Sequence, residues 1–360
     1  MKRLLILSAS AGAGHNRAAE ALHAACREYY PDIDAEWADA LKYTPRLFRK
    51  FYEQSYLWMA NHSPTIWGLL YKLTGKKVRP KSDKILQAYD RMGYARLVKF
   101  IDRAAPDAVI ATHFLAPNVI VAHKGRHLPV YTVVTDYDIH PAWYNPDVAG
   151  YFVPIEEVKV QLTRMGYPEE KIRVTGIPIH PTFARTRETA RRALKLREAL
   201  PVVLFMSGGF GVGDMETAVE RLARLADRCQ IVVVCGKNEA LRKKLSRTKG
   251  LQVHGFVKNV QDFMQESDLV ITKAGGLTVS ECLAKGAPMV IYSPIPGQEE
   301  RNCDYLLERG AAVKAKDLDV LDFKVAELLE APEKLATMKK AARSAARPYA
   351  ARDVLRHVIG

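Results

Sequence analysis

Four continuous apolar runs in the second half of this 360-residue chain constrain its fold more than any other feature. They alternate with helical patterns, and their sequences are VVLFM (202–206), IVVVC (231–235), LVIT (269–272) and MVIY (289–292). A strand with one wet face alternates apolar and polar residues, whereas a continuously apolar strand is buried on both faces, as in a parallel sheet between helices. The second half is therefore predicted to be a doubly wound α/β domain.

The first half repeats this alternation of apolar runs and helical patterns. Its expected strands lie at 3–8, 33–40, 107–113, 129–136, 150–154 and 171–178. The segment 178–188 has two prolines and no clear periodicity, so it is predicted to be a linker. A chain of 360 residues is longer than one that usually folds around a single hydrophobic core. We therefore expect an N-terminal domain over 1–180, a C-terminal domain over 181–345 and a last helix over 346–360.

Composition excludes several classes of protein. No run approaches the roughly 20 apolar residues that a helix needs to cross a bilayer. The five cysteines are odd in number and form no C-x-x-C pair. This usage is typical of reduced thiols in a cytoplasmic protein and argues against a structural zinc site.

Two glycine-containing turns in the second half have the pattern of anion-binding loops. MSGGFGVGDM (206–215) follows a buried strand and precedes a helix, but it lacks the lysine of a P-loop. In TKAGGLTVSE (272–281), Gly275 and Gly276 open a turn before a helix. Glu281 follows Thr278 at capping-box spacing, so it is either part of a helix cap or a carboxylate that holds ribose hydroxyls. Gln298, Glu299 and Asn302 lie where ligands bind in open α/β sheets, although polar residues at a helix start are often only caps.

The first half has a similar junction in SASAGAGH (8–15). Gly12 and Gly14 lie before a helix, and His15 near its start is predicted to have a low pKa, so that it is neutral and able to accept a proton. The residues alone favour a simpler role for His15, a hydrogen bond within the turn. Asp136, at the end of a strand, is an alternative base or a group that orients His15. Three further side chains, which are candidates to line an acceptor pocket, are His113, His140 and Trp143.

These segments carry a family resemblance. GFVKNV…GQEERN (255–302) resembles the donor-binding region of glycosyltransferase family 28. SASAGAGHNRAAEAL (8–22) and VVTDYDIHPAWYNPDVAGYFVP (133–154) are similar to its monogalactosyl- and glucosyl-diacylglycerol synthase branch. The resemblance covers nearly the whole chain. It implies a GT-B architecture, in which two Rossmann-like doubly wound domains face each other across a cleft, a UDP-sugar donor, inversion at the anomeric carbon, and no cofactor or essential metal.

The resemblance also implies roles for individual residues. Phe256 and Val257 would edge the uracil, and Glu281 would hold the ribose. Gln298 and Glu299 would meet the sugar hydroxyls, with Asn302 beside them. His15 becomes the favoured base for the acceptor hydroxyl, and Gly12 and Gly14 let its loop approach the phosphates and the acceptor. The residues expected at the diphosphate are Ser207, Gly209, Gly275, Gly276, Leu277 and Thr278.

One segment of the first half is strongly basic. The chain has a net charge of +14, and residues 42–103 contribute 14 Lys and Arg against 4 Asp and Glu. Eight aromatic residues lie between Tyr43 and Tyr71. The segment is an ordinary helix pair with a solvated rim, a surface for single-stranded nucleic acid, or a surface that docks on anionic lipid. Lipid docking is favoured, because an enzyme with a lipid acceptor needs a membrane-facing surface.

The predicted function is transfer of a hexose from a UDP-sugar to a lipid hydroxyl, with diacylglycerol as the expected acceptor. The expected place of action is the cytoplasmic face of the cell membrane, with no nucleic-acid partner. Alternatives are transfer of N-acetylglucosamine to another lipid and a non-catalytic nucleotide-sugar-binding protein. A nicotinamide oxidoreductase, with Glu36 or Asp39 on the ribose, and a metal at Asp136–Asp138 are weaker interpretations.

Overall fold

The computed structural model describes residues 1–10, 12–45, 84–124, 127–188, 190–206 and 215–360. It divides into two compact units. The first contains residues 1–181 together with 349–360, and the second contains residues 182–348. Most of the basic aromatic segment, residues 46–83, lies outside the described residues, and with it the lipid-docking interpretation.

The first unit is built on a six-stranded parallel sheet with the strand order β2-β1-β3-β4-β5-β6. The strands are β1 (Arg3–Ser8), β2 (Asp34–Asp39), β3 (Ala108–Ala111), β4 (Val130–Val133), β5 (Gly150–Val153) and β6 (Ile172–Val174). The α-helices are α1 (Ala13–Tyr29), α4 (Lys84–Ala104), α5 (Leu115–Lys124), α6 (Glu156–Arg164) and α15 (Ala350–Ile359), and the short 3-10 helices are η1 (Ala40–Tyr43), η2 (Pro141–Trp143) and η3 (Glu169–Lys171).

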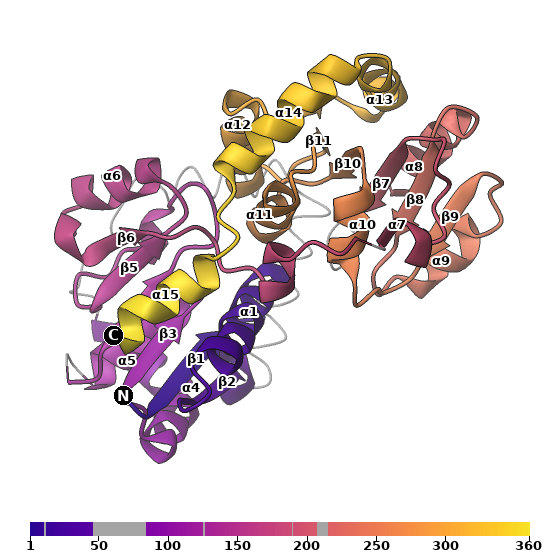
Figure 1. Cartoon of the computed structure of the whole chain (residues 1–360). Coiled ribbons are helices and arrows are strands. Elements are labelled where there is room, and N and C mark those ends of the chain that lie inside the picture. Colours follow the sequence, from indigo (N-terminus) through magenta and orange to yellow (C-terminus); the bar gives the residue numbers. More distant parts are fainter. Residues whose placement is uncertain (11, 46–83, 125–126, 189, 207–214) are drawn as a thin grey trace. The chain divides into compact units, whose positions relative to one another are not determined.

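Helices cover both faces of this sheet, which explains why its inner strands β1, β3, β4 and β5 are mostly apolar and buried. Leu5 and Leu7 of β1 pack in one core cluster with residues of α4 and α5. Leu4 and Ile6 point to the opposite face and pack with residues of α1 and α15. Figure 1 shows α15, from the C-terminal end of the chain, beside the sheet of the first unit, and it contacts α1.

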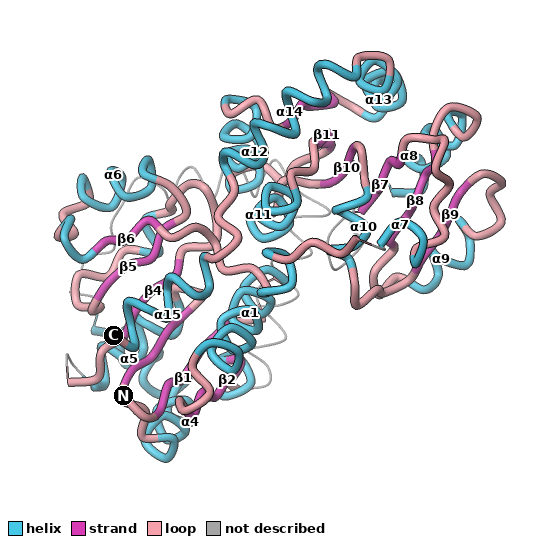
Figure 2. Tube along the Cα trace, in the orientation of Figure 1, coloured by secondary structure: helices cyan, strands magenta, loops and turns pink. Residues whose placement is uncertain are grey.

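The second unit repeats the design with the strand order β12-β11-β10-β7-β8-β9, and the alternation of helix and strand is visible in Figure 2. The strands are β7 (Val202–Met206), β8 (Gln230–Val234), β9 (Leu251–His254), β10 (Leu269–Thr272), β11 (Met289–Tyr292) and β12 (Ala312–Ala315). The α-helices are α7 (Ala190–Ala193), α8 (Met215–Leu222), α9 (Glu239–Leu245), α10 (Val260–Glu266), α11 (Gly276–Lys285), α12 (Gln298–Glu308), α13 (Leu321–Leu329) and α14 (Pro332–Ala345), and the 3-10 helices are η4 (Pro181–Ala184), η5 (Ala223–Leu225) and η6 (Leu318–Val320).

The strand orders confirm the prediction of two doubly wound sheets and locate the candidate site of each unit. In an open parallel sheet, ligands bind beyond the carboxyl ends of the strands where the chain switches from building one side to the other. The switch lies between β1 and β3 in the first unit and between β7 and β10 in the second. No helix in the described parts of the chain is both long and apolar enough to span a bilayer.

Candidate functional site

The switch point of the first unit brings together side chains that are far apart in the sequence. His15 lies in the first turn of α1, which follows β1, and His113 lies just after β3. The two rings are edge to face, with centroids 4.7 Å apart. Trp143, at the end of η2, lies with its ring centroid 6.1 Å from each histidine. The predicted site residues His15, His113 and Trp143 therefore form one cluster.

Hydrogen bonds fix the tautomer of His15. Its Nδ1 atom lies 2.7 Å from the carbonyl oxygen of Thr112. A carbonyl oxygen only accepts, so Nδ1 carries the proton and Nε2 has the free lone pair. The Thr135 hydroxyl is 3.1 Å from the same nitrogen, and the Thr112 hydroxyl donates to the His15 carbonyl over 2.9 Å. The ring is thus held with Nε2 as its basic atom.

Burial keeps His15 neutral. Loss of hydration lowers the pKa of His15 to about 4, although the hydrogen bond to the Thr112 carbonyl acts in the opposite direction. The low pKa that the sequence predicts is present, but burial is its main cause rather than the helix N-terminus. At neutral pH the imidazole can therefore accept a proton.

His113 has the opposite tautomer. Its side chain is buried, and its Nδ1 atom accepts a hydrogen bond of 3.1 Å from the backbone N–H of Leu115. The proton of the neutral ring is therefore on Nε2. Burial, and secondarily the proximity of His15, hold the pKa of His113 well below its usual range. The pair thus combines one ring whose Nε2 accepts with one ring whose Nε2 donates.

Other predicted residues of the first unit have structural contacts. The His140 Nδ1 atom accepts from the N–H of Ala142 and caps η2. Asp136 is partly buried directly after Thr135. The hydrogen bonds to the His15 ring come from Thr112 and Thr135, so these two residues, which the sequence did not single out, have the orienting role that was considered for Asp136.

The glycines of the first loop differ in their roles. Gly12, the N-cap of α1, has a φ angle of 112°, which only glycine adopts without strain. A Cβ atom on Gly14 would meet no described atom within 4 Å. Gly12 is therefore needed for the backbone turn, whereas Gly14 leaves open space beside His15.

Asp39 is occupied by the same loop. Its Oδ1 atom accepts from the N–H groups of Ser10 and Leu41, and its Oδ2 atom accepts from the Ser10 hydroxyl. Asn16 donates in turn to that hydroxyl. Through these contacts the Asp39 carboxylate orders the loop after β1. Its oxygens are therefore occupied, which argues against the interpretation of Asp39 as the ribose-binding acid of an oxidoreductase.

The switch point of the second unit contains the start of α11. This helix begins at Gly276, and its N-cap, Gly275, has no side chain with which to cap it. The expected cap at Thr278 is wrong, because Thr278 is already the third residue of the helix. The N–H groups at the start of a helix favour a bound anion. The capping-box interpretation of Glu281 fails with it, and ribose binding by Glu281 stays a prediction.

Three carboxylate and amide side chains lie close to this helix start. Glu281 is 1% exposed on the second turn of α11. Asn302 is fully buried and donates to the carbonyl of Ala274 over 2.9 Å, so its amide supports the turn after β10. Glu299 Oε2 accepts from the N–H of Ile295, while its Oε1 lies 3.6 Å from the position that a Cβ on Gly275 would take.

The remaining donor-site candidates are more dispersed. Gln298 is the first residue of α12, whose N-cap Gly297 donates to Glu300 over 3.1 Å. Phe256, 68% exposed, and the partly buried Val257 follow β9. An exposed aromatic ring at the carboxyl end of a strand is available to a planar base. Ser207 and Gly209 lie outside the described residues.

The aspartates of the DYD segment were the weaker candidate for a metal site. Gln161 donates to Asp138 over 2.6 Å. Within the described ranges, no group of three or more His, Cys, Asp or Glu side chains is arranged to hold a metal ion.

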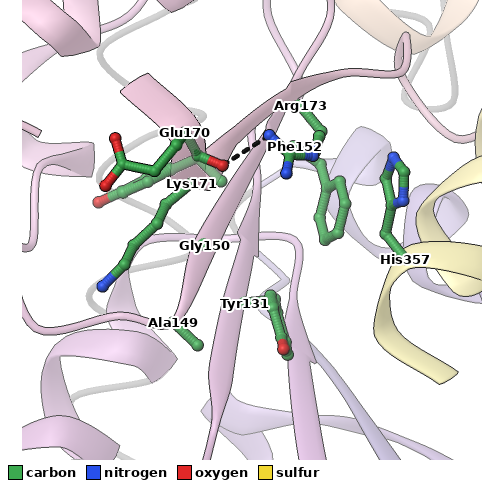
Figure 3. A pocket seen from close by; sticks show the side chains of 9 residues that line it. Tyr131, Ala149, Gly150, Phe152, Glu170, Lys171, Arg173 and His357 are labelled. Carbon is green, nitrogen blue, oxygen red and sulfur yellow. Dashed lines mark hydrogen bonds between the residues drawn. The ribbon is translucent and has the colours of Figure 1, made fainter. Parts of the chain in front are cut away.

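A surface pocket of the first unit lies away from these residues (Figure 3). It forms at the amino ends of β4, β5 and β6, opposite the edge that carries His15. Glu170, Lys171, Arg173 and His357 line it, and all four are exposed. Arg173 Nη1 donates to the Glu170 carbonyl over 2.6 Å. None of the predicted site residues lines this pocket.

Comparisons with known proteins cover both units. Residues 15–179 match the family model of monogalactosyldiacylglycerol synthase, and residues 202–354 match the glycosyltransferase family 28 C-terminal domain. A processive diacylglycerol β-glucosyltransferase of Bacillus subtilis is 31% identical and aligns over 94% of this chain and 90% of its own length. A processive diacylglycerol β-glucosyltransferase of Bacillus thuringiensis is 32% identical and aligns over 99% of this chain and 93% of its own length.

Solved structures share the fold at low identity. MurG of Acinetobacter baumannii has a TM-score of 0.64 at 16% identity and covers 100% of this chain and 99% of its own. The S. aureus MnaA complex with UDP has a TM-score of 0.68 at 13% identity and covers 99% and 96%. At these identities the similarity concerns the fold alone.

Proposed function

The chain belongs to the glycosyltransferase family of the diacylglycerol glucosyltransferases and monogalactosyldiacylglycerol synthases, and on this premise we propose that it transfers a hexose from a UDP-sugar to the hydroxyl group of diacylglycerol. The Nε2 atom of His15 takes the proton of the acceptor hydroxyl. The hydroxyl oxygen bonds to the anomeric carbon as the bond from that carbon to the diphosphate oxygen breaks. The products are a β-hexosyl lipid, formed by one inversion of an α-linked donor, and UDP.

The geometry of His15 is the observation that carries this proposal. Its Nδ1–H group donates a hydrogen bond to the Thr112 carbonyl oxygen over 2.7 Å, so the basic lone pair of the ring is on Nε2. A base that is neutral at working pH and has a fixed tautomer meets two requirements of general base catalysis, the correct protonation state and the correct orientation. His113 lies beside it, and the proton of its neutral ring is on Nε2.

The second unit supplies the groups proposed for the donor. The start of α11, whose N-cap is a glycine, suits a diphosphate, because backbone N–H groups and the helix dipole stabilise the charge that develops on the leaving group. Glu281 suits the ribose hydroxyls as a carboxylate acceptor, and Phe256 suits the uracil. Gln298 and Glu299 are proposed for the sugar, and Asn302 for supporting the turn after β10.

Release of UDP that depends on both substrates tests this function. Purified protein is incubated with UDP-glucose, UDP-galactose or UDP-N-acetylglucosamine, each with and without diacylglycerol in mixed micelles. We expect UDP release with one donor to rise at least about tenfold when diacylglycerol is present. Binding of UDP-sugar without any release would instead support a non-catalytic protein.

We propose that the transfer needs no metal ion, because the start of α11 meets the charge of the leaving diphosphate. Treatment with EDTA followed by desalting is expected to change the initial rate by less than about twofold. Loss of activity on chelation that Mg²⁺ or Mn²⁺ restores would contradict this part of the proposal.

We also propose that the protein acts at an anionic membrane surface, since its acceptor is a lipid and residues 42–103 carry a net charge of +10. Flotation with liposomes tests this. The protein is expected to float with vesicles that contain an anionic phospholipid and to be released by high salt, because surface charge attraction is screened. Failure to float with anionic vesicles at low salt contradicts it.

A further inference from the structure

The loop between β4 and β5, which carries Trp143, is held from inside the first unit by one buried hydroxyl group. Tyr151, the second residue of β5, is fully buried. Its hydroxyl donates to the carbonyl oxygen of Trp143 over 2.7 Å and accepts from the N–H of Asn145 over 2.7 Å. One side chain therefore fixes the backbone on both sides of residue 144.

The indole of Trp143 is the ring that this anchor places. Trp143 is 6% exposed, and its ring centroid is 6.1 Å from both His15 and His113. Phe114 packs against the same indole with centroids 5.7 Å apart. The indole thus packs beside the histidine pair, of which His113 is buried and His15 is partly buried.

We propose that Tyr151 is a positioning residue of the histidine site: its hydroxyl holds the backbone of Trp143, so that the indole stays beside His15 and limits the access of water to it. The proposal rests on the proposed function only for the role of His15 as the base. The placement of Trp143 beside the two histidines stands on the contacts themselves.

The proposal has a consequence for the titration of His15. Burial is the main cause of the low pKa of His15, about 4. If the indole moves away, water enters and the pKa rises towards 6.5, the ordinary value for histidine. The other titratable groups on the adjoining segments are His113 after β3, Asp39 at the end of β2, and Asp136, Tyr137, Asp138 and His140 in the loop after β4. Tyr151→Phe substitutes none of them.

Tyr167 provides a matched control. It is also a buried tyrosine, 2% exposed, and its ring packs edge to face on that of Tyr151 with centroids 4.7 Å apart. Its hydroxyl donates to the carbonyl of Val148 over 2.9 Å, in the same loop but five residues beyond Trp143. Tyr167→Phe therefore removes a comparable buried hydroxyl without releasing Trp143.

The test measures the reactivity of His15 directly. Diethyl pyrocarbonate acylates neutral imidazole, and peptide mass spectrometry gives the rate at each histidine between about pH 5 and pH 8. In the unchanged protein the rate at His15 is expected to be low and nearly independent of pH. In Tyr151→Phe it is expected to rise at least about threefold at pH 8 and to fall below about pH 6. In Tyr167→Phe it should match the unchanged protein.

Two results overturn the proposal. The first is a His15 profile in folded Tyr151→Phe that matches the profile in Tyr167→Phe. The second comes from Trp143→Leu, which removes the indole but leaves the backbone carbonyl that Tyr151 binds. This variant also tests the proposal if Tyr151→Phe does not fold. A His15 rate that stays low and independent of pH in Trp143→Leu contradicts the role of the indole. Because the readout needs no sugar transfer, failure of the proposed function is seen separately, as absence of UDP release in the unchanged protein.

Discussion

His15→Asn is expected to lower kcat by about 10²- to 10⁴-fold, the usual contribution of a general base, while the KM for the UDP-sugar changes little. The asparagine amide can still donate to the Thr112 carbonyl in place of Nδ1–H, but it has no basic atom in place of Nε2. The substitution therefore removes the proton acceptor and preserves the local hydrogen bond. Initial rates at saturating donor and acceptor measure the effect.

His123→Asn serves as the control for this substitution, because His123 is an exposed histidine on α5. It is expected to retain full activity. Free imidazole should restore part of the activity of His15→Gly by occupying the vacated space. If His15→Asn keeps the kcat of the unchanged protein, the base lies elsewhere, and Asp136 becomes the group to change next.

The pH profile gives a second readout for the same residue. With a pKa of about 4, His15 remains neutral well below its ordinary pKa of 6.5, so kcat/KM should not fall as the pH drops through 6.5. The folded protein keeps His15 and His113 neutral, whereas the unfolded chain binds protons at both histidines below about pH 6.5. The free energy of unfolding therefore also falls as the pH drops below this value. Circular dichroism at each pH therefore accompanies the rates. An acidic limb near 6.5 in folded protein contradicts the buried base.

Glu281→Gln is expected to weaken binding of the donor by about 10- to 100-fold with a much smaller effect on kcat. The glutamine has nearly the same volume, so the packing of α11 should be preserved. A hydrogen bond to a charged group contributes about 1.5–3 kcal/mol, which corresponds to this change in Kd. Isothermal titration with UDP measures the effect without any acceptor lipid.

Glu308→Gln is the matched control for Glu281, because Glu308 is an exposed glutamate at the end of α12. It should bind UDP like the unchanged protein. If the two variants bind UDP equally well, Glu281 does not contact the nucleoside, and its burial requires a purely structural explanation.

Local patterns predicted the sheets because a strand with a continuous apolar run has no face that suits exposure to solvent. Runs such as VVLFM and MVIY therefore indicated parallel strands covered on both sides, and the structure has them as β7 and β11. The partner of the last helix could not be predicted. Residues 350–359 form α15, which packs on α1, and this contact between the two ends of the chain leaves no mark in either local pattern.

The candidate sites show the same limit at the level of single residues. His15 and His113 follow strands that are neighbours only because of the strand order, so their ring contact depends on topology. Thr112 and Thr135 were missed, because one acts through its backbone carbonyl and both need the three-dimensional position of His15. A cap at Thr278 was one of two interpretations, because its spacing to Glu281 fits a capping box, but the N-cap is Gly275, three residues earlier.

Mass spectrometry of the lipid products tests the central claim most directly. The protein is incubated with diacylglycerol and each of the three UDP-sugars, and the lipids are extracted and analysed for mass and for the configuration of the linkage. The account predicts a β-linked hexosyl diacylglycerol with a UDP-hexose, and no such product from His15→Asn at the same enzyme concentration. Release of free hexose and UDP without any glycolipid, or a glycolipid formed equally well by His15→Asn, would contradict it.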